Sequence, residues 1–323
     1  MSAASILEDV VRAVRKHPGL IGKDSIRLVT DVLGPTDWVS GPGDDAAVVD
    51  VGTGRIVVGG EALWPPFVEA DPHAAGIAAI IANVNDLAAM GARPLGIVDT
   101  IVAPEATARM ALEGMAQAAA IYRVPIVGGH LTIRDGPPAL SAFGIGEANR
   151  LLSSARVTAG LVLLVVTCLE GEMRNDFAFF SSIKRRGIRL GDDVRALAEV
   201  ADAELCIAAK DVSMAGVLGS LAMLLECSGA GAVVDLKALP RPSGVALPTW
   251  TIAFPTFSFL LCAWPDRAEA CREVFRRRGL ACERLGLLDA SGVIKLRLDD
   301  QERRLLDLGT ERVTGLARGH GVT

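Results

Sequence analysis

Residues 83–94, Asn-Val-Asn-Asp-Leu-Ala-Ala-Met-Gly-Ala-Arg-Pro, close a long apolar segment of the chain. The segment predicts a helix over 72–90, because Asp71 suits its N-cap and small apolar residues fill its body. Such a helix can pack closely on a sheet. Asn83 and Asp86 are three residues apart and so share one face of that helix. An amide and a carboxylate on an apolar helix are costly to bury alone, so we expect polar partners for them.

Three further segments combine glycine with acidic or imidazole side chains. They read Gly43-Asp44-Asp45, Gly59-Gly60-Glu61 and Val127-Gly128-Gly129-His130. Glycine lets a backbone turn sharply or come close to phosphate oxygens. Clustered carboxylates beside such turns suit a divalent cation, above all magnesium, that carries nucleotide phosphates. The pattern therefore favours phosphate chemistry.

Each of these residues also has a simpler interpretation. Gly-Asp-Asp is common in exposed turns, and Asp86 could serve a structural salt bridge or hydrogen bond. His130 could be a metal ligand, a phosphate contact or a general acid and base, but lone histidines are more often structural. Lys23 could meet a phosphate as a point charge or lie in a solvated loop. These alternatives stay open at the level of single residues.

The order of the predicted elements favours an α/β (α+β) fold with two domains. The first half reads β-β-α-β-α-β, which predicts a mixed sheet with helices on one face. With 323 residues, two domains are the natural expectation. We place an amino-terminal domain at 1–148 and a carboxy-terminal α/β domain at 149–323.

Some local predictions depend on short patterns. The spacing predicts a strand over 124–128 that ends in the Gly-Gly-His motif. It predicts helices near 176–187 and over 192–202, and a proline-rich loop over 240–248.

Composition excludes several classes of function. The net charge is −5 and no long basic run occurs, which argues against nucleic acid as the main partner. Acidic residues interrupt the amino-terminal segment early, and no apolar run is long enough to span a membrane. We therefore expect a cytosolic (cytoplasmic) protein without membrane contact. All six cysteines lie in the second half without a CxxC pair, so we expect buried, reduced thiols.

No Walker A motif and no credible Rossmann fingerprint are present. Taken together, however, the segments at 43–48, 83–94 and 127–130 resemble those of the aminoimidazole ribonucleotide (AIR) synthetase superfamily. Its members include thiamine-monophosphate kinase, selenophosphate synthetase, the hydrogenase-maturation carbamoyl dehydratase and formylglycinamidine ribonucleotide synthetase. The resemblance covers essentially the whole chain.

The resemblance implies a homodimer formed through the amino-terminal sheets, with ATP and Mg²⁺ as cofactors and a small-molecule substrate. It implies metal and phosphate contacts by Asp44, Asp45, Glu61 and Asp86, and nucleotide contacts by Gly43, Asn83, Gly128 and Gly129. It also implies catalytic contacts by Lys23 and His130, and a substrate side at Asp211 and Ser213.

Departures from the family patterns leave the substrate open. Thiamine-monophosphate kinases carry Asp-x-Ser-Asp-Gly, whereas this chain reads Asp211-Val-Ser213-Met214-Ala-Gly. The kinases also carry a Glu-Asp-Tyr segment, whereas this chain reads Thr256-Phe-Ser. We therefore expect an ATP- and magnesium-dependent enzyme that activates a small metabolite by phosphoryl transfer. A thiamine-monophosphate kinase and a non-catalytic nucleotide-binding dimer are the alternatives.

Overall fold

A computed structural model describes residues 2–34, 43–52, 54–174 and 177–316. The chain forms two compact units that interleave along the sequence. Unit 1 comprises Met1–Asp44, Leu151–Arg185 and Val200–Thr323, and unit 2 comprises Asp45–Arg150 and Arg186–Glu199. The domain boundary at 148/149 remains a prediction.

Unit 2 is built on a five-stranded sheet with the strand order β1-β2-β5-β3-β4. The strands are β1 (Ala47–Asp50), β2 (Arg55–Ala62), β3 (Arg93–Ala103), β4 (Ile126–Ile133) and β5 (Ala139–Ala148). β3 and β4 run parallel and the other neighbours run antiparallel. The predicted mixed sheet is therefore confirmed.

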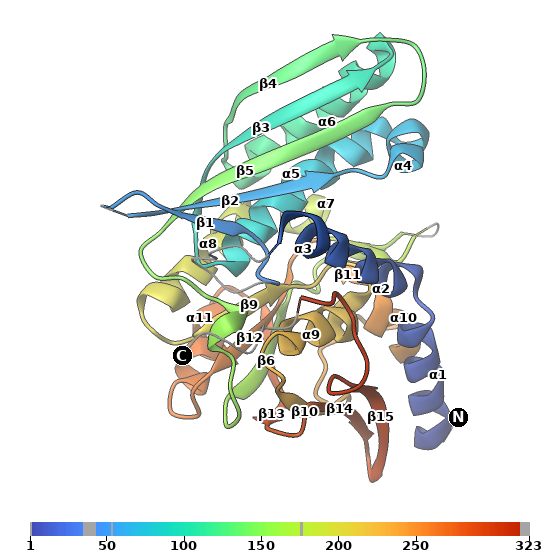
Figure 1. Ribbon diagram of the computed structural model, residues 1–323, viewed down its shortest axis with the longest axis vertical. Helices are drawn as coiled ribbons and strands as arrows, with labels where there is room; N and C mark the ends of the chain where they lie inside the picture. The colour runs from blue at the N-terminus through green and yellow to red at the C-terminus, as the bar shows by residue number, and fades with distance from the viewer. Residues whose placement is uncertain (1, 35–42, 53, 175–176, 317–323) are drawn as a thin grey trace. The chain divides into compact units, whose positions relative to one another are not determined.

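Two long helices cover one face of this sheet (Figure 1). They are α5 (Pro72–Ala89) and α6 (Glu105–Tyr122), and a short helix α4 (Pro65–Ala70) precedes them. The predicted helix over 72–90 is thus confirmed, and the Asp71 carboxylate caps it by accepting a bond from the Ala74 N–H at 3.0 Å. The opposite face of the sheet exposes apolar side chains, among them Leu95 and Phe143.

Unit 2 also contains a buried ion pair in the segment after residue 185. This segment begins at the end of α7 (Ile183–Arg186), continues through the turn η3 (Gly187–Arg189) and contains most of α8 (Leu190–Asp202). The Arg186 guanidinium donates to both carboxylate oxygens of Asp193 at 2.7 and 2.8 Å. Both side chains are almost fully buried. This two-bond geometry fixes the start of α8.

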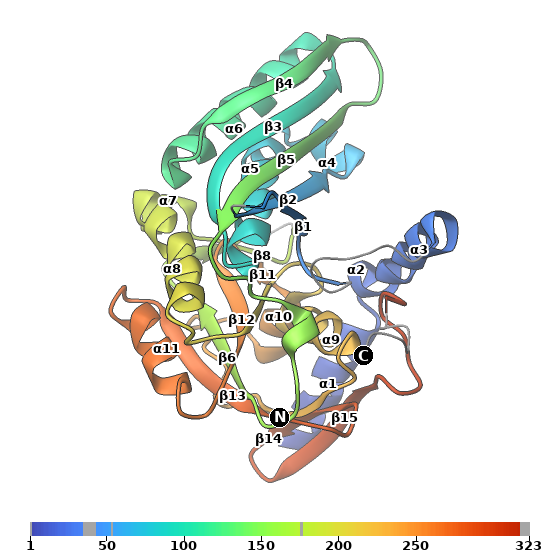
Figure 2. The ribbon, with the colours of Figure 1, turned by 60° about the vertical axis from the view of Figure 1, so that its left-hand side comes forward.

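Unit 1 is built on a seven-stranded mixed sheet with the order β15-β14-β10-β13-β6-β12-β9 (Figure 2). The strands are β6 (Val162–Thr167), β9 (Ala208–Asp211), β10 (Gly231–Asp235), β12 (Ser258–Ala263), β13 (Ala281–Asp289), β14 (Val293–Leu298) and β15 (Gln301–Asp307). β6 and β12 are buried along their whole length, as expected for central strands covered on both faces.

Three helices pack with this sheet around one apolar core. They are α1 (Ala3–Arg15), α9 (Gly216–Glu226) and α10 (Leu247–Ile252). α1 buries Leu7, Val10 and Val14, which recur at the three- and four-residue spacing of one helix face. Every residue of α9 is buried.

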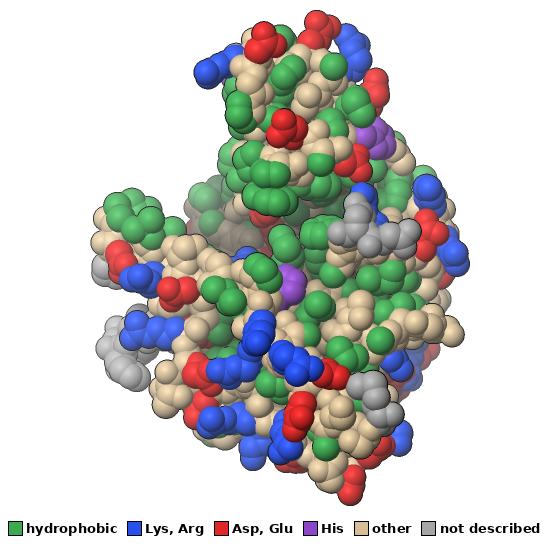
Figure 3. Space-filling view, turned by 90° about the vertical axis from the view of Figure 1, so that its right-hand side faces the viewer, with side chains coloured by type: hydrophobic (Ala, Val, Ile, Leu, Met, Phe, Trp, Pro, Cys, Tyr) green, Lys and Arg blue, Asp and Glu red, His purple; other side chains and the backbone are tan. Residues whose placement is uncertain are grey.

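The amino-terminal helix is also tied to β15 by charged side chains. Arg15 bonds the Leu305 carbonyl at 2.7 Å and pairs with Glu311, and Arg303 pairs with Glu8 at 3.2 Å. Figure 3 shows basic side chains gathered on this face with acidic side chains among them. Basic and acidic side chains thus pair with one another between α1 and the β15 region.

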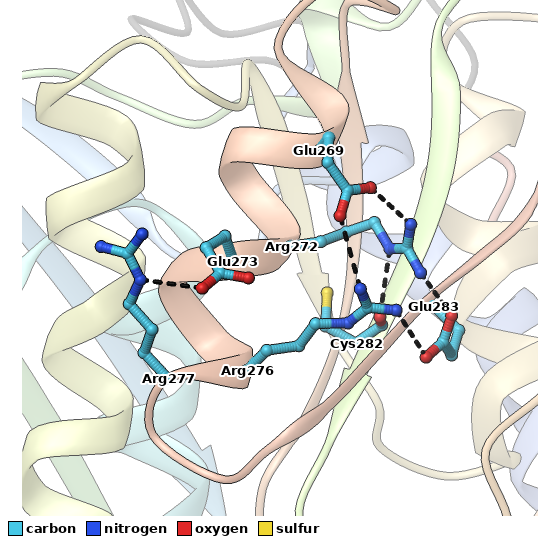
Figure 4. Close-up of polar contacts among 7 residues, drawn as sticks. All are labelled: Glu269, Arg272, Glu273, Arg276, Arg277, Cys282 and Glu283. Atoms are coloured by element: carbon cyan, nitrogen blue, oxygen red, sulfur yellow. Dashed lines mark hydrogen bonds and ion pairs between the residues drawn. The ribbon is translucent and has the colours of Figure 1, made fainter.

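An ion-pair network joins α11 (Ala268–Arg276) to β13 (Figure 4). Glu269 and Glu283 each contact both Arg272 and Arg276, at distances between 2.6 and 3.4 Å. Arg272 also donates to the Cys282 carbonyl at 3.2 Å. The hydrogen bond to Glu283 raises the pKa of Arg276. These four charged side chains thus link α11 to β13.

Several local predictions are wrong. The Gly-Gly-His motif lies inside β4 rather than at a strand end, because β4 continues to Ile133. Within the predicted helix near 176–187, residues 179–181 instead form β8 (Phe179–Ser181), which joins β7 (Glu172–Met173) and β11 (Phe254–Pro255) in a small sheet, whereas Ile183–Arg186 are helical as predicted. The proline-rich loop over 240–248 is confirmed as far as residue 246, and its last two residues begin α10, whose first turn accommodates a proline.

The structure also contains elements that the sequence did not predict. Among them are α2 (Pro18–Ile21), η1 (Gly22–Ile26), α3 (Arg27–Leu33), α4, η2 (Ser154–Arg156) and β15. All six cysteines are buried with free thiols, as predicted. Among the described residues, no helix combines the length and apolar character needed to cross a bilayer.

Candidate functional site

Two of the predicted metal ligands meet in unit 2. Asp45 precedes β1, and Asp86 lies in the last turn of α5. Carboxylate oxygens of these two residues lie within 4.8 Å of each other. Both side chains are half-buried, so the pair is accessible to a ligand. Carboxylates at this separation repel each other unless a cation or a proton lies between them.

Asn83 lies one helical turn before Asp86. It is fully buried, and its Nδ2 donates to the Ala79 carbonyl at 2.9 Å and to the Ala142 carbonyl at 3.1 Å. The amide therefore ties α5 to the middle of β5. Its Oδ1 has no hydrogen-bond partner among the described residues, and this oxygen lies beside Gly59 of β2.

Glu61 lies two residues beyond Gly59 on β2. Successive odd positions of a strand share a face, so Glu61 and Gly59 both point to the helix-covered side. Glu61 is exposed near the end of its strand. The structure thus places Asp45, Glu61, Asn83 and Asp86 on one side of the unit 2 sheet.

Asp44 belongs to unit 1 and has a different environment. Its Oδ1 accepts bonds from the Ser154 N–H and hydroxyl, both at 2.6 Å, and its Oδ2 accepts one from the Ser153 hydroxyl at 2.6 Å. Three donors fix this carboxylate on the η2 turn. Gly43 precedes it with φ at +89°, a backbone conformation that side chains disfavour.

The Gly128-Gly129-His130 motif lies on β4, the edge strand of the sheet. Across the sheet, His130 pairs in register with Thr100 of β3, and that face is the one without α5 and α6. Its Nε2 lies 3.3 Å from the Thr132 hydroxyl. Within unit 2, the structure therefore does not bring His130 together with Asp45 and Asp86.

Gly129 instead packs against a carboxylate that sequence reasoning missed. A methyl group at Gly129 would lie 2.7 Å from Oδ2 of Asp99. Asp99 is 6% exposed, and burial raises its pKa. The signal in the sequence was a single acidic residue inside the apolar strand Gly96-Ile-Val-Asp-Thr-Ile-Val.

The remaining predicted residues lie in unit 1. Asp211 ends β9 and is buried, and the Lys210 ammonium lies 3.2 Å from its Oδ1. The Ser213 N–H donates to the Ser220 hydroxyl at 3.1 Å. Lys23 lies in η1, half-exposed. Lys210 is a second residue that sequence reasoning missed, since nothing in Ala-Ala-Lys-Asp marks its lysine as buried.

Comparisons with known proteins agree with the resemblance seen in the sequence. The family model "AIR synthase related protein, N-terminal domain" matches residues 43–148, and the corresponding C-terminal domain model matches residues 151–299. An uncharacterized protein of Synechocystis is 30% identical over 318 residues, covering 96% of this chain and 98% of the relative. An uncharacterized protein of Methanocaldococcus jannaschii is 26% identical, with coverage of 96% and 99%.

Longer relatives and solved structures share the fold. Phosphoribosylformylglycinamidine synthase subunit PurL of Synechocystis is 25% identical over 90% of this chain, which spans 43% of that subunit. The structure of T. maritima PurL with ADP has a TM-score of 0.78 at 19% identity, covering 94% of this chain and 51% of PurL. AaThiL with AMPPCP and TMP has a TM-score of 0.66 at 17% identity, with coverage of 86% and 95%.

The chain thus spans about half the length of the PurL chains it matches, and its fold is related to that of proteins solved with bound adenine nucleotides. On both domain models and the full-length relative at 30% identity, the chain belongs to the AIR synthase related protein family.

Proposed function

We propose that this protein is an ATP- and magnesium-dependent enzyme that activates a small metabolite by phosphoryl transfer. The observation that carries the proposal is the pair of carboxylates, Asp45 and Asp86, within 4.8 Å on unit 2. Support comes from related structures, which include T. maritima PurL with ATP and with ADP. Phosphoryl transfer requires charge neutralisation and positioning more than covalent chemistry by the protein.

The donor set fits magnesium. Mg²⁺ takes oxygen ligands at about 2.0–2.1 Å in octahedral geometry, so its ligand oxygens lie roughly 2.9 Å apart when adjacent and roughly 4.1 Å apart when opposite. Small side-chain adjustments bring the Asp45 and Asp86 oxygens into that range, and Glu61 and the Asn83 Oδ1 are further oxygen donors on the same side of the sheet. When bound, the metal would neutralise the charge of the nucleotide phosphates.

The other predicted residues receive roles within the same proposal. We assign the three-donor carboxylate of Asp44 to holding the turn that leads to Asp45. Gly43, Gly128 and Gly129 would let backbone approach the nucleotide. Lys23 would contact phosphate or substrate. His130 lies on the sheet face away from Asp45 and Asp86, so it would make such a contact only where that open face takes part in the site.

The substrate side is assigned to unit 1. Asp211, oriented by Lys210, and Ser213 would line it. The phosphate acceptor is left unnamed, because this region departs from the thiamine-monophosphate kinase pattern.

We further propose a homodimer formed through the open face of the unit 2 sheet. Leu95, Val127 and Phe143 are each more than 40% exposed there, and a patch of large apolar side chains favours a protein partner. Light scattering coupled to size exclusion measures the mass. A Phe143→Arg variant should shift it toward the monomer if this face is the interface.

Calorimetric titration of ATP, with and without magnesium, tests the proposal. Asp86→Asn and Asp45→Asn should each abolish magnesium-dependent binding without changing the circular dichroism spectrum. Glu105→Gln is the matched control, because Glu105 is exposed on α6 and pairs with Arg109, one helical turn away. Absence of binding by the parent protein would refute the proposal.

Turnover separates the alternatives. ATP consumption would be measured with thiamine monophosphate, with formylglycinamide ribonucleotide and with a panel of other small metabolites. Consumption with thiamine monophosphate would favour the kinase. Binding of ATP without consumption on any acceptor would favour a non-catalytic nucleotide-binding protein.

A further inference from the structure

Glu226 is a buried carboxylate at an unfavourable place. It is the last residue of α9 and is 7% exposed. A negative charge at the carboxyl end of a helix opposes the helix dipole, and a buried charge requires strong hydrogen bonds. Something outside the helix must therefore stabilise it.

The donors come from one short segment near the end of the described chain. The carboxylate accepts bonds from the N–H groups of Val313 at 2.7 Å, Thr314 at 2.8 Å and Gly315 at 3.3 Å. The Thr314 hydroxyl also donates to it. Four donors on one buried carboxylate hold residues 313–315 firmly, because hydrogen bonds to an ionised acceptor are stronger than neutral ones.

The next residue connects this segment to the turn that begins the Gly-Asp-Asp motif. The Cys227 thiol donates to the Leu316 carbonyl at 3.4 Å. Gly43 approaches the same sulfur so closely that a methyl group there would lie 2.6 Å from Sγ. Cys227 therefore lies between the carboxy-terminal segment and the Gly43–Asp44 turn, and all of these residues belong to unit 1.

We infer that Glu226 is a positioning residue. By binding residues 313–316 as a strap, it holds the Cys227 sulfur against Gly43 and so sets the conformation of the Gly43–Asp44 turn. The role of the turn in nucleotide binding rests on the proposed function. The effect of residues 313–316 on the conformation of the turn does not depend on the proposed function.

Hydrogen–deuterium exchange of the full chain without nucleotide tests the inference. In Glu226→Gln, one acceptor oxygen becomes an amide that meets N–H donors. Exchange at 313–316 and at 43–46 should both accelerate by about tenfold or more, the factor expected when a charge-assisted hydrogen bond is lost. Glu283→Gln is the control, since that glutamate pairs with Arg272 and Arg276 and should leave both segments unchanged.

Two further variants separate the steps and remain informative if Glu226→Gln fails to fold. Thr314→Val removes one donor and should loosen both segments to a smaller extent. Cys227→Ala leaves the Glu226 bonds in place and should accelerate exchange at 43–46 while 313–315 stays protected. Faster exchange at 313–316 with an unchanged turn in Glu226→Gln and in Thr314→Val would overturn the inference.

The affinity for magnesium-ATP is a second measurement, and a change in global stability alone does not alter it while the protein remains folded. Glu226→Gln should weaken it several-fold relative to Glu283→Gln, measured at a temperature at which both variants are fully folded. Unchanged affinity, despite a loosened turn, would overturn the link to the nucleotide site. If the parent protein binds no nucleotide, the proposed function fails, whereas the exchange results still decide whether the strap sets the turn.

Discussion

The crossing of α5 and α6 depends on two glycines, and replacing one of them should destabilise unit 2. A methyl group at Gly76 of α5 would lie 2.0 Å from the Ala111 carbonyl oxygen of α6 and 3.0 Å from the Met115 nitrogen. A methyl group at Gly114 of α6 would lie 2.0 Å from the His73 carbonyl oxygen. Both obstacles are backbone atoms, which cannot rotate away.

Two opposing effects set the size of the Gly76→Ala change. Alanine in a helix interior is favoured over glycine by about 1 kcal/mol. Against this, the helices must separate by at least about 1 Å, and overpacking of this kind costs about 1–3 kcal/mol. Because the clash is with backbone, we expect a cost near 3 kcal/mol and a net loss of about 2 kcal/mol. For a unit of this size a loss of about 2 kcal/mol should lower the thermal midpoint by about 8 °C.

Thermal unfolding followed by circular dichroism measures the effect. Gly22→Ala is the control, because Gly22 lies in a helical turn with nothing within 4 Å of the added methyl group, and it should be neutral or slightly stabilising. The double variant Gly76→Ala/Gly114→Ala should lose less than the sum of the single changes, since one separation relieves both clashes. A Gly76→Ala protein as stable as the parent would refute this account of the crossing. Since α5 carries Asp86, the same variant should also weaken magnesium-dependent nucleotide binding.

Three further changes should affect stability in defined directions. Burial raises the pKa of Asp99, so ionisation of this carboxyl destabilises the fold once the pH exceeds the ordinary pKa of aspartate. Asp99→Asn should therefore raise the denaturant midpoint at pH 7, and this gain should vanish below pH ~4. The hydrogen bond from Arg15 lowers the pKa of Glu311, so this pair stabilises the fold above the ordinary glutamate pKa and its contribution is lost as pH falls; Glu311→Gln should flatten the acid side of a stability–pH curve, and an unchanged slope would contradict this reasoning. Asp193→Ala breaks the buried pair with Arg186 and should cost about 3–5 kcal/mol in urea unfolding, whereas a loss below about 1 kcal/mol would show that the pair is dispensable.

The sequence predicted the architecture well where its signal was local and periodic. The helix over 72–90 was identified from its cap and its apolar body, and the mixed sheet of the first half from the order of its predicted elements. The family followed from short motifs whose order survives wide divergence. Short elements were missed because their patterns are brief: the strand at 179–181 and the helix at 247–252 are stabilised by their neighbours rather than by their own periodicity.

The site divides in the same way. The residue types at 45 and 86 already suggested oxygen ligands for a hard cation, although an exposed turn at 45 and a structural hydrogen bond at 86 explained each residue equally simply. Their separation was not in the sequence, since it depends on where α5 crosses β2. The partners of buried charges were equally invisible: Ser153 and Ser154 on Asp44, and residues 313–315 on Glu226, lie far along the chain from the carboxylates they bind. Sequence by itself determined which residues carry charge and which long helices and strands form, because those depend mainly on neighbours within a few positions. Only the tertiary structure decided which charges meet and which donors satisfy them. Folding brings donors that are far away in the sequence within hydrogen-bond distance, and burial strengthens the bonds they make.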